Sequence, residues 1–222
     1  MRMRKKPNLP QRMGRYAWLL EREPERLRGR WLREFIGKKE LHLELGCGKG
    51  RFTVGTAAQR PDVLLAAVEV VPDAMVVAME RAGERGLTNV RFIDGDAAAC
   101  ASMFAPGEVS RIYINFPDPW PKKKQFKRRL TAPSFLKLYA GLLCDGGEIW
   151  FKTDNRPLFD WSLEQFSSCG WTLSEVTNDL HAQGGGGVMT DYEAKFSEMG
   201  VPINRCVARK PTRLDVECQT QT

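Results

Sequence analysis

Short apolar segments alternate with helical segments along most of this chain. The expected strands, each bounded by glycine, proline or aspartate, span residues 41–45, 64–68, 90–94, 111–115 and 147–152. Helical segments lie near residues 50–59, 73–85, 97–103, 133–143 and 157–168. Because a helix between two parallel strands crosses over a face of the sheet, this order predicts an α/β fold with a mostly parallel sheet and helices on both faces.

The C-terminal part departs from this alternation. Residues 170–177 and 202–209 look extended and are separated by a glycine-rich loop at residues 183–187. We expect these two segments to pair antiparallel and to complete one edge of a seven-stranded sheet.

Length and composition favour one domain that does not enter a membrane. We place this domain at residues 40–210, between a basic N-terminal extension (1–39) and a tail (211–222) that we expect to be disordered. The sequence has no apolar run of about 18 residues, and its basic N-terminus lacks the apolar stretch of a signal peptide. We therefore expect a cytoplasmic protein that acts as a monomer or a homodimer.

Cysteine and histidine usage points away from disulfides and metals. The six cysteines show no C-x-x-C spacing, and a chain of this length folds without disulfides, so we expect reduced thiols. With only His42 and His181 and no clustered thiols, we expect no metal site.

The net charge of +7 is unevenly distributed. Residues 1–39 carry 13 Lys and Arg against four Asp and Glu, and residues 122–129 add six positive charges, which leaves −8 on the rest of the chain. A single charged run is equally well explained as a solvated surface without a binding partner. Two basic segments on an acidic body favour a polyanionic partner, because each neutralised phosphate releases counterions. Prolines interrupt the first segment and directly precede the second, which disfavours a membrane-surface helix.

A glycine-rich turn follows the first expected strand. Glycines at positions 46, 48 and 50 allow a tight turn and a close approach of the backbone to a ligand, and the next helix offers its N-terminal amides there. The spacing is G-x-G-x-G and not the G-x-G-x-x-G of dinucleotide binders, so the turn alone is a weak signal.

Acidic side chains at the ends of the first three strands strengthen the prediction of a ligand site at the glycine-rich turn. Glu69 follows the second strand, where a carboxylate can accept both hydroxyls of a ribose, and Asp96 follows the third, where one can accept from an adenine amino group. Glu44, just before the glycines, can face an ammonium group. Each acid alone is equally well explained as a solvated residue at the end of a strand. Acids at the ends of three successive strands favour S-adenosylmethionine, which combines an amino-acid end, a ribose and an adenine.

The segment Asn115–Arg129 (NFPDPWPKKKQFKRR) follows the fourth strand directly. A rigid acidic turn with an aromatic ring leads into six basic residues, at the sheet edge where open α/β sheets bind their ligands. This combination favours an enzyme that presents a nucleobase to the cofactor.

With these motifs, the chain resembles the bacterial tRNA (guanine-N7)-methyltransferase family over nearly its whole length. The densest matches are residues 44–50, Asn115–Leu130, Phe151–Asn155 (FKTDN) and Thr190–Phe196 (TDYEAKF). The resemblance implies a Rossmann-like class I methyltransferase that transfers a methyl group from S-adenosylmethionine to N7 of guanosine 46 in the tRNA variable loop.

The resemblance also implies roles for individual residues. The cofactor would be bound by Glu44, Gly46, Gly48, Gly50, Glu69, Asp96 and Asp118, with Asp118 also the catalytic residue. The substrate would be bound by Lys122, Asp154, Thr190, Asp191, Tyr192 and Glu193. RNA would be contacted by Lys124, Gln125, Phe126, Lys127, Arg128 and Arg129.

The chemistry of N7 methylation agrees with these roles. Guanine N7 has a free in-plane lone pair and no proton, so its methylation needs no general base; what remains is to position the reactants. A carboxylate that accepts from the guanine Watson–Crick edge becomes a stronger partner as the base gains positive charge. We favour Asp118 for this contact, with Asp154 as a second clamp, whereas Trp120 can stack on the base or line the pocket.

Several features keep alternatives open. Residues 190–193 follow the glycine-rich loop and are either a flap over the substrate or a plain surface turn, in which Glu193 pairs with Lys195 or Arg205. The NFPDPW turn faintly resembles the N-P-P-[YFW] turn of exocyclic-amine methyltransferases. A second alternative is a non-catalytic RNA-binding protein that keeps a methyltransferase fold.

Overall fold

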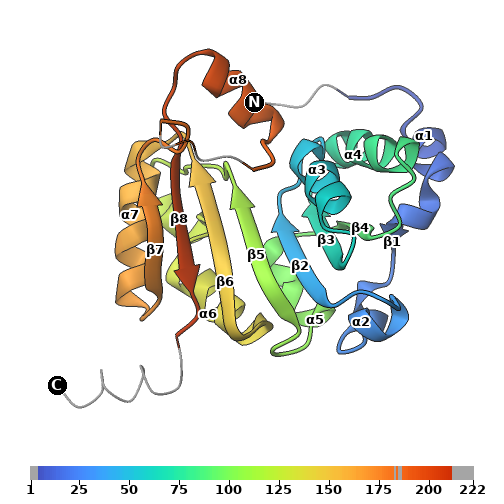
Figure 1. Cartoon of the computed structure of the whole chain (residues 1–222), viewed down its shortest axis with the longest axis horizontal. Helices are drawn as coiled ribbons and strands as arrows, with labels where there is room; N and C mark the ends of the chain where they lie inside the picture. The colour runs from blue at the N-terminus through green and yellow to red at the C-terminus, as the bar shows by residue number, and fades with distance from the viewer. Residues whose placement is uncertain (1–4, 183, 185–186, 212–222) are drawn as a thin grey trace.

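The computed structural model describes residues 5–182, 184 and 187–211 (Figure 1). The strands in this part of the chain are β1 (Leu20–Glu21), β2 (Glu40–Leu45), β3 (Val63–Glu69), β4 (Val90–Asp94), β5 (Val109–Asn115), β6 (Leu143–Thr153), β7 (Thr172–Thr177) and β8 (Asn204–Arg209). They form one sheet in the order β1-β4-β3-β2-β5-β6-β8-β7. The tail expected at residues 211–222 lies, apart from Pro211, outside the described residues.

The sheet is parallel except at one side. Strands β1 to β6 pair parallel with one another, whereas β8 lies antiparallel between β6 and β7. The predicted α/β fold with an antiparallel pair at one edge is therefore confirmed. The structure adds an eighth strand, β1, whose Leu20 pairs with Phe92 at the opposite edge. Two residues carry too little period-2 pattern to be recognised in the sequence.

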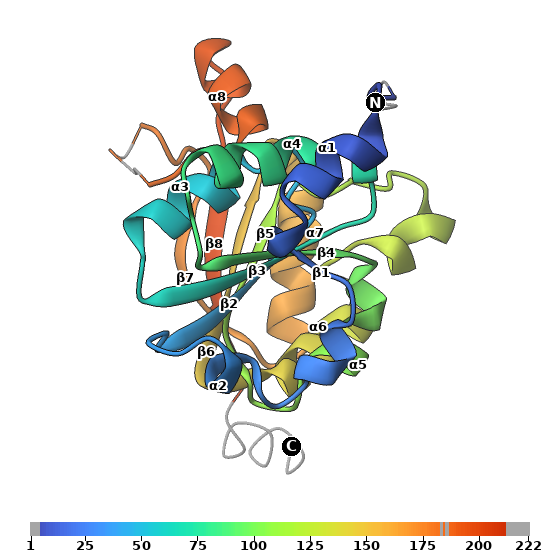
Figure 2. The ribbon, with the colours of Figure 1, turned by 90° about the vertical axis from the view of Figure 1, so that its right-hand side faces the viewer.

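Helices lie on both faces of the sheet (Figure 2). The α-helices are α1 (Leu9–Arg15), α2 (Trp31–Glu34), α3 (Arg51–Gln59), α4 (Pro72–Glu84), α5 (Cys100–Met103), α6 (Pro133–Leu142), α7 (Arg156–Ser168) and α8 (Asp191–Glu198). Short 3₁₀ turns are η1 (Ala17–Leu19), η2 (Pro24–Leu27), η3 (Ala97–Ala99) and η4 (Lys123–Arg128). Proline in the first turn starts α4, α6 and α7, where its missing amide costs no hydrogen bond.

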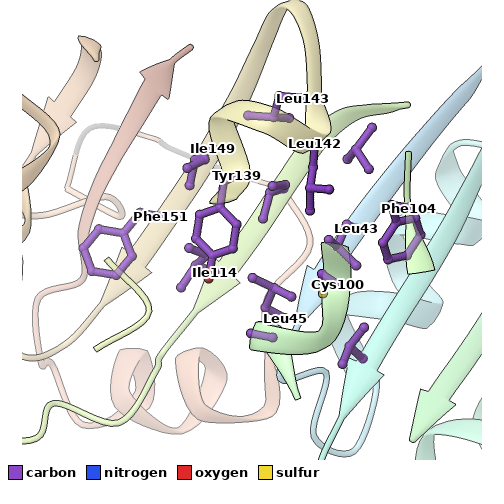
Figure 3. Close-up of a cluster of buried hydrophobic side chains, with 14 of the residues drawn as sticks. Leu43, Leu45, Cys100, Phe104, Ile114, Tyr139, Leu142, Leu143, Ile149 and Phe151 are labelled. Carbon is purple, nitrogen blue, oxygen red and sulfur yellow. The ribbon is translucent and has the colours of Figure 1, made fainter. Parts of the chain in front are cut away.

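Alternation along the strands directs apolar side chains to one face of the sheet. Leu43 and Leu45 of β2 and Ile114 of β5 pack there against Tyr139 of α6 and Cys100 of α5 (Figure 3). A second cluster on the other face joins α1, α3 and α4 to β3 and β4. The intervening residues of β2, β5 and β6 therefore point to the side of α3, and many of them are polar.

The N-terminal segment packs against the domain. The Arg12 guanidinium of α1 binds both carboxylate oxygens of Glu80 on α4, at 2.7 and 2.6 Å. Tyr16 lies against Gly83, where a Cβ would come within 2.1 Å of the ring. Trp31 of α2 is fully buried in the main core. Residues 5–39 thus contribute to the core as well as carrying positive charge.

None of the helices described here is both long and apolar enough to cross a membrane.

Candidate active site

The glycine turn after β2 contains three left-handed residues. Gly46, Gly48 and Gly50 have φ values of 79°, 56° and 75°, a region that residues with side chains rarely adopt. A Cβ on Gly50 would lie 2.4 Å from the Cβ of Ala78, so this glycine also lets α3 approach α4. The turn therefore keeps the backbone uncovered at the N-terminus of α3, where it can approach a ligand.

Glu44 lies two residues before this turn and is 1% exposed. Its carboxylate accepts hydrogen bonds from Thr53 Oγ1 at 2.6 Å and from Asn115 Nδ2 at 3.4 Å. Burial raises the pKa of Glu44 to about 7, against the opposing effect of both hydrogen bonds. Within the described residues no cation forms an ion pair with Glu44, so the site favours a ligand that brings a positive charge.

Glu69 ends β3 and organises the glycine turn. Its two carboxylate oxygens accept from the amide of Gly48 at 2.7 Å and from the amide of Val71 at 2.9 Å. The next residue, Val70, is 58% exposed and offers an apolar surface beside these acids. In the loop after β4, Asp96 accepts from the amide of Ala98 at 2.8 Å and caps η3.

The residues after β5 form a strained turn that carries Asp118. Phe116 and Trp120, on either side of it, have φ values of 52° and 40°. Residues with side chains hold such conformations only where their surroundings enforce them. The prolines at 117, 119 and 121 fix their own φ angles and remove three amide donors. Asp118 itself is exposed to solvent.

Arg129 is directed into the protein. It is 5% exposed, and its Nε and Nη2 donate to the carbonyls of Pro119 at 2.9 Å and Trp120 at 3.3 Å. The guanidinium also lies 3.6 Å from the centre of the Phe126 ring and 4.5 Å from that of Trp161. This position does not fit the RNA contact expected for Arg129, because its exposed surface is small and two of its three guanidinium nitrogens already donate to the turn.

The other members of the basic run face solvent. Lys122, Lys124, Lys127 and Arg128 are exposed, the last three on η4. The Arg128 guanidinium lies 5.0 Å from the centre of the Trp120 ring. Gln125 and Phe126 are half-buried, and Phe126 meets the Trp161 ring edge-on, which limits its availability to RNA.

Thr190 to Glu193, expected as a flap or a turn, begin helix α8. The Thr190 hydroxyl accepts from the Glu193 amide at 2.9 Å and the Glu193 carboxylate accepts from the Thr190 amide at 3.3 Å, a capping box. Glu193 is 2% exposed, and its Oε2 lies 2.6 Å from Lys152 Nζ. The expected alternatives, Lys195 and Arg205, are therefore wrong as its partner, and its burial leaves little access for a guanine.

Two further contacts hold α8 above the carboxyl ends of the parallel strands (Figure 1). Asp191 pairs with Arg81 of α4 at 2.8 Å, and the same guanidinium nitrogen donates to the Lys49 carbonyl of the glycine turn. Phe196 stacks on Phe116 of the Asp118 turn, with ring centres 6.4 Å apart. The glycine turn, the Asp118 turn and α8 are thus in one continuous contact network.

Sequence reasoning missed several residues of this network. Lys152, Arg81 and Asn115 each connect a segment that was recognised to one far away in the chain. Lys152 carried a usable signal, since a lysine inside an otherwise apolar strand implies a buried partner. Asp154, expected as a clamp, is half-buried just beyond the end of β6.

The described residues contain no cluster of three or more His, Cys, Asp or Glu side chains able to hold a metal ion.

Comparisons with known proteins agree with this geometry. Residues 38–206 match a family described as "Putative methyltransferase". The chain is 44% identical to the tRNA (guanine-N(7)-)-methyltransferase of Geobacillus kaustophilus, over 96% of this chain and 99% of the relative. It is 42% identical to the protein of the same name from Streptococcus suis, over 94% of this chain and 99% of the relative.

Solved structures share the fold at low sequence identity. The 16S rRNA methyltransferase KamB has a TM-score of 0.62 and 15% identity, over 85% of this chain and 92% of that one. The 16S rRNA (adenine(1408)-N(1))-methyltransferase from Catenulisporales acidiphilia has a TM-score of 0.55 and 12% identity, over 94% of both chains.

The sheet order, the glycine turn and the acids at the strand ends define a methyltransferase of the Rossmann-like class I type. Within that class, the chain belongs to the bacterial tRNA (guanine-N7)-methyltransferase family.

Proposed function

We propose that this protein transfers a methyl group from S-adenosylmethionine to N7 of a tRNA guanosine, at position 46 in the variable loop. The observation that carries this proposal is the near full-length similarity, at 40–44% identity, to relatives named as tRNA (guanine-N(7)-)-methyltransferases; position 46 is our expectation from the sequence resemblance. We also propose that the protein acts in the cytoplasm, with residues 40–210 as its methyltransferase domain and residues 5–39 packed onto it as part of the same folded unit.

The residues around the glycine turn fit the proposed cofactor. Glu44 has neutral hydrogen-bond partners, so its carboxylate suits the ammonium of an amino-acid end. Glu69 already accepts two backbone amides, and its free lone pairs suit ribose hydroxyls. Val70 and Asp96 supply an apolar surface and a carboxylate for an adenine. S-adenosylmethionine, when bound, supplies a methyl group on an activated sulfonium.

The protein's contribution is positioning. Because N7 carries no proton, no residue has to act as a base, and holding the reactants in line can lower the barrier by roughly 7–11 kcal/mol. Asp118, on its rigid turn, would accept from the guanine Watson–Crick edge and stabilise the positive charge that develops on the ring. Its exposure leaves it accessible to a base from outside the protein.

The surface around this turn suits a tRNA. Lys122, Lys124, Lys127 and Arg128 form an exposed basic stripe directly beyond Asp118. Thr190, Asp191 and Tyr192 lie at the start of α8, and Tyr192, 55% exposed, offers a ring to a base. We assign to Asp154 a second contact to the guanine and to Gln125 a minor contact to the RNA.

The test is to incubate the protein with unmodified bulk tRNA and methyl-labelled S-adenosylmethionine, and to identify and map the methylated nucleoside. We expect 7-methylguanosine at position 46. Methylation of an exocyclic amine would support the first alternative, and tRNA binding without methylation would support a non-catalytic RNA-binding protein.

A further inference from the structure

The turn that carries Asp118 has few hydrogen bonds of its own. Between residues 117 and 121, only Asp118 and Trp120 have backbone amides, because the other three positions are prolines. In the part of the chain that the structure describes, the side-chain hydrogen bonds to this turn come from one residue, Arg129. The turn also holds Trp120 in a left-handed conformation, which needs support from its surroundings.

We propose that Arg129 is a positioning residue for Asp118: its guanidinium binds two successive carbonyls of the turn and holds the carboxylate in the geometry that the reaction needs. This inference rests on the proposed function, in which Asp118 contacts the guanine. Arg129 thus has a different role from the exposed cations of the basic run, although it is part of the same run in the sequence.

The surroundings of Arg129 fit a clamp and not a phosphate contact. The side chain is 5% exposed, and its guanidinium lies against the rings of Phe126 and Trp161, which meet each other edge-on. Trp161 belongs to α7, so the clamp attaches the turn to the helix layer behind the sheet. A buried guanidinium without an acidic partner is costly unless its donors find acceptors, and the two carbonyls accept from two of its three nitrogens.

Lysine cannot replace arginine in this arrangement. Two different nitrogens, Nε and Nη2, reach the carbonyls of Pro119 and Trp120, and their spacing is set by the planar group. A lysine would keep the charge but has one compact ammonium, and it would lose the flat contact with the two rings. Arg129→Lys therefore removes the paired hydrogen bonds to the two carbonyls while preserving the positive charge.

The experiment compares Arg129→Lys with Lys127→Ala, a neighbouring exposed member of the basic run. For each variant, kcat is measured at saturating tRNA and cofactor, together with the salt dependence of tRNA binding and the calorimetric Kd for S-adenosylmethionine. For Arg129→Lys we expect kcat to fall at least tenfold, with an unchanged salt slope and an unchanged Kd. For Lys127→Ala we expect a salt slope reduced by about 0.7–0.9, because one phosphate contact is lost, and an unchanged Kd for S-adenosylmethionine.

A second measurement does not depend on tRNA. The folded protein is digested briefly with trypsin, and mass spectrometry measures the rate of cleavage after Lys122, Lys123 and Lys124. This rate reports how rigidly the turn is held. We expect faster cleavage in Arg129→Lys than in the wild-type protein or in Lys127→Ala.

A wild-type kcat and a wild-type cleavage rate in Arg129→Lys would overturn the proposal, as would a loss of tRNA affinity with kcat intact. If the wild-type protein methylates no tRNA, the proposed function fails, and the cleavage rates still decide whether Arg129 holds the turn.

Discussion

Glu44 and Asp118 show at the residue scale how two carboxylates of one site acquire different properties. Glu44 is enclosed by β2, α3 and β5, and its pKa is raised to about 7 by burial. Asp118 is exposed on a turn that prolines stiffen. Glu44 is suited to bind the positively charged group of a ligand that covers it from water. Asp118 is suited to bind a nucleobase that approaches from solvent.

Replacing Asp118 by Asn should retain the fold and most of the cofactor affinity while lowering kcat by on the order of 10²-fold, as the loss of one transition-state contact does. Steady-state kinetics at saturating tRNA, with a calorimetric Kd for the cofactor, measures both quantities. Turnover near the wild-type rate would remove Asp118 from the catalytic role.

Glu44→Gln tests the protonation of the buried carboxylate. Because the folded pKa of Glu44 is raised from 4.5 to about 7, the wild-type protein loses stability relative to the variant as the pH rises through that interval. The difference should approach roughly 3 kcal/mol above pH 7, at about 1.4 kcal/mol per unit. Urea unfolding of both proteins at pH 5 and pH 8 measures it, and a difference that does not change with pH would contradict the burial argument.

At the scale of elements, α8 connects the parts of the site. Glu193 caps the helix and pairs with Lys152 of β6, while Asp191 pairs with Arg81 of α4. The Lys152 side chain is 12% exposed, so neither member of the first pair is well hydrated. Burial lowers the pKa of Lys152, and the Glu193 carboxylate opposes that shift. Helix α8 therefore depends on one buried ion pair more than on its own short sequence.

Lys152→Met should destabilise α8, because it removes the 2.6 Å ion pair and leaves the buried Glu193 carboxylate with only the Thr190 amide and His181, 3.5 Å away, at a cost of about 3–5 kcal/mol. Hydrogen exchange of residues 190–198 should become faster, and tRNA should bind more weakly. The double variant Lys152→Met/Glu193→Gln is the matched control, since it removes both charges and should recover part of the protection. Equal exchange in all three proteins would contradict the proposed role of the pair.

At the scale of the whole molecule, positive charge lies on the N-terminal segment and on the stripe beyond Asp118, around a body that carries −8. Residues 5–39 pack on α4 and into the main core, so the two basic regions belong to one folded unit. A tRNA approaching the carboxyl ends of the strands would meet the stripe at η4.

Lys124→Ala/Lys127→Ala should lower the slope of log Kd against log salt for tRNA by about 1.4–1.8, because each lost phosphate contact removes 0.7–0.9. Arg85→Ala/Lys137→Ala removes the same charge from exposed positions that are not part of the stripe and should leave the slope unchanged. Salt titrations of tRNA binding measure both. Identical slopes in the two variants would mean that the stripe is only a solvated surface.

The sequence by itself determined the succession of β2 to β8 with the helices α3 to α7, the glycine turn, and the acids at the strand ends. These depend on neighbours along the chain: a period of two residues in β2, a proline at the start of α6, left-handed glycines at positions 46, 48 and 50. Only the tertiary structure decided which way Arg129 points, which partner Glu193 takes, and that α1 lies on α4. Each of these is set by groups distant in sequence, such as Trp161 for Arg129 and Lys152 for Glu193. Burial gives such contacts their strength, and burial follows from the packed fold, so the composition of a local segment does not reveal it.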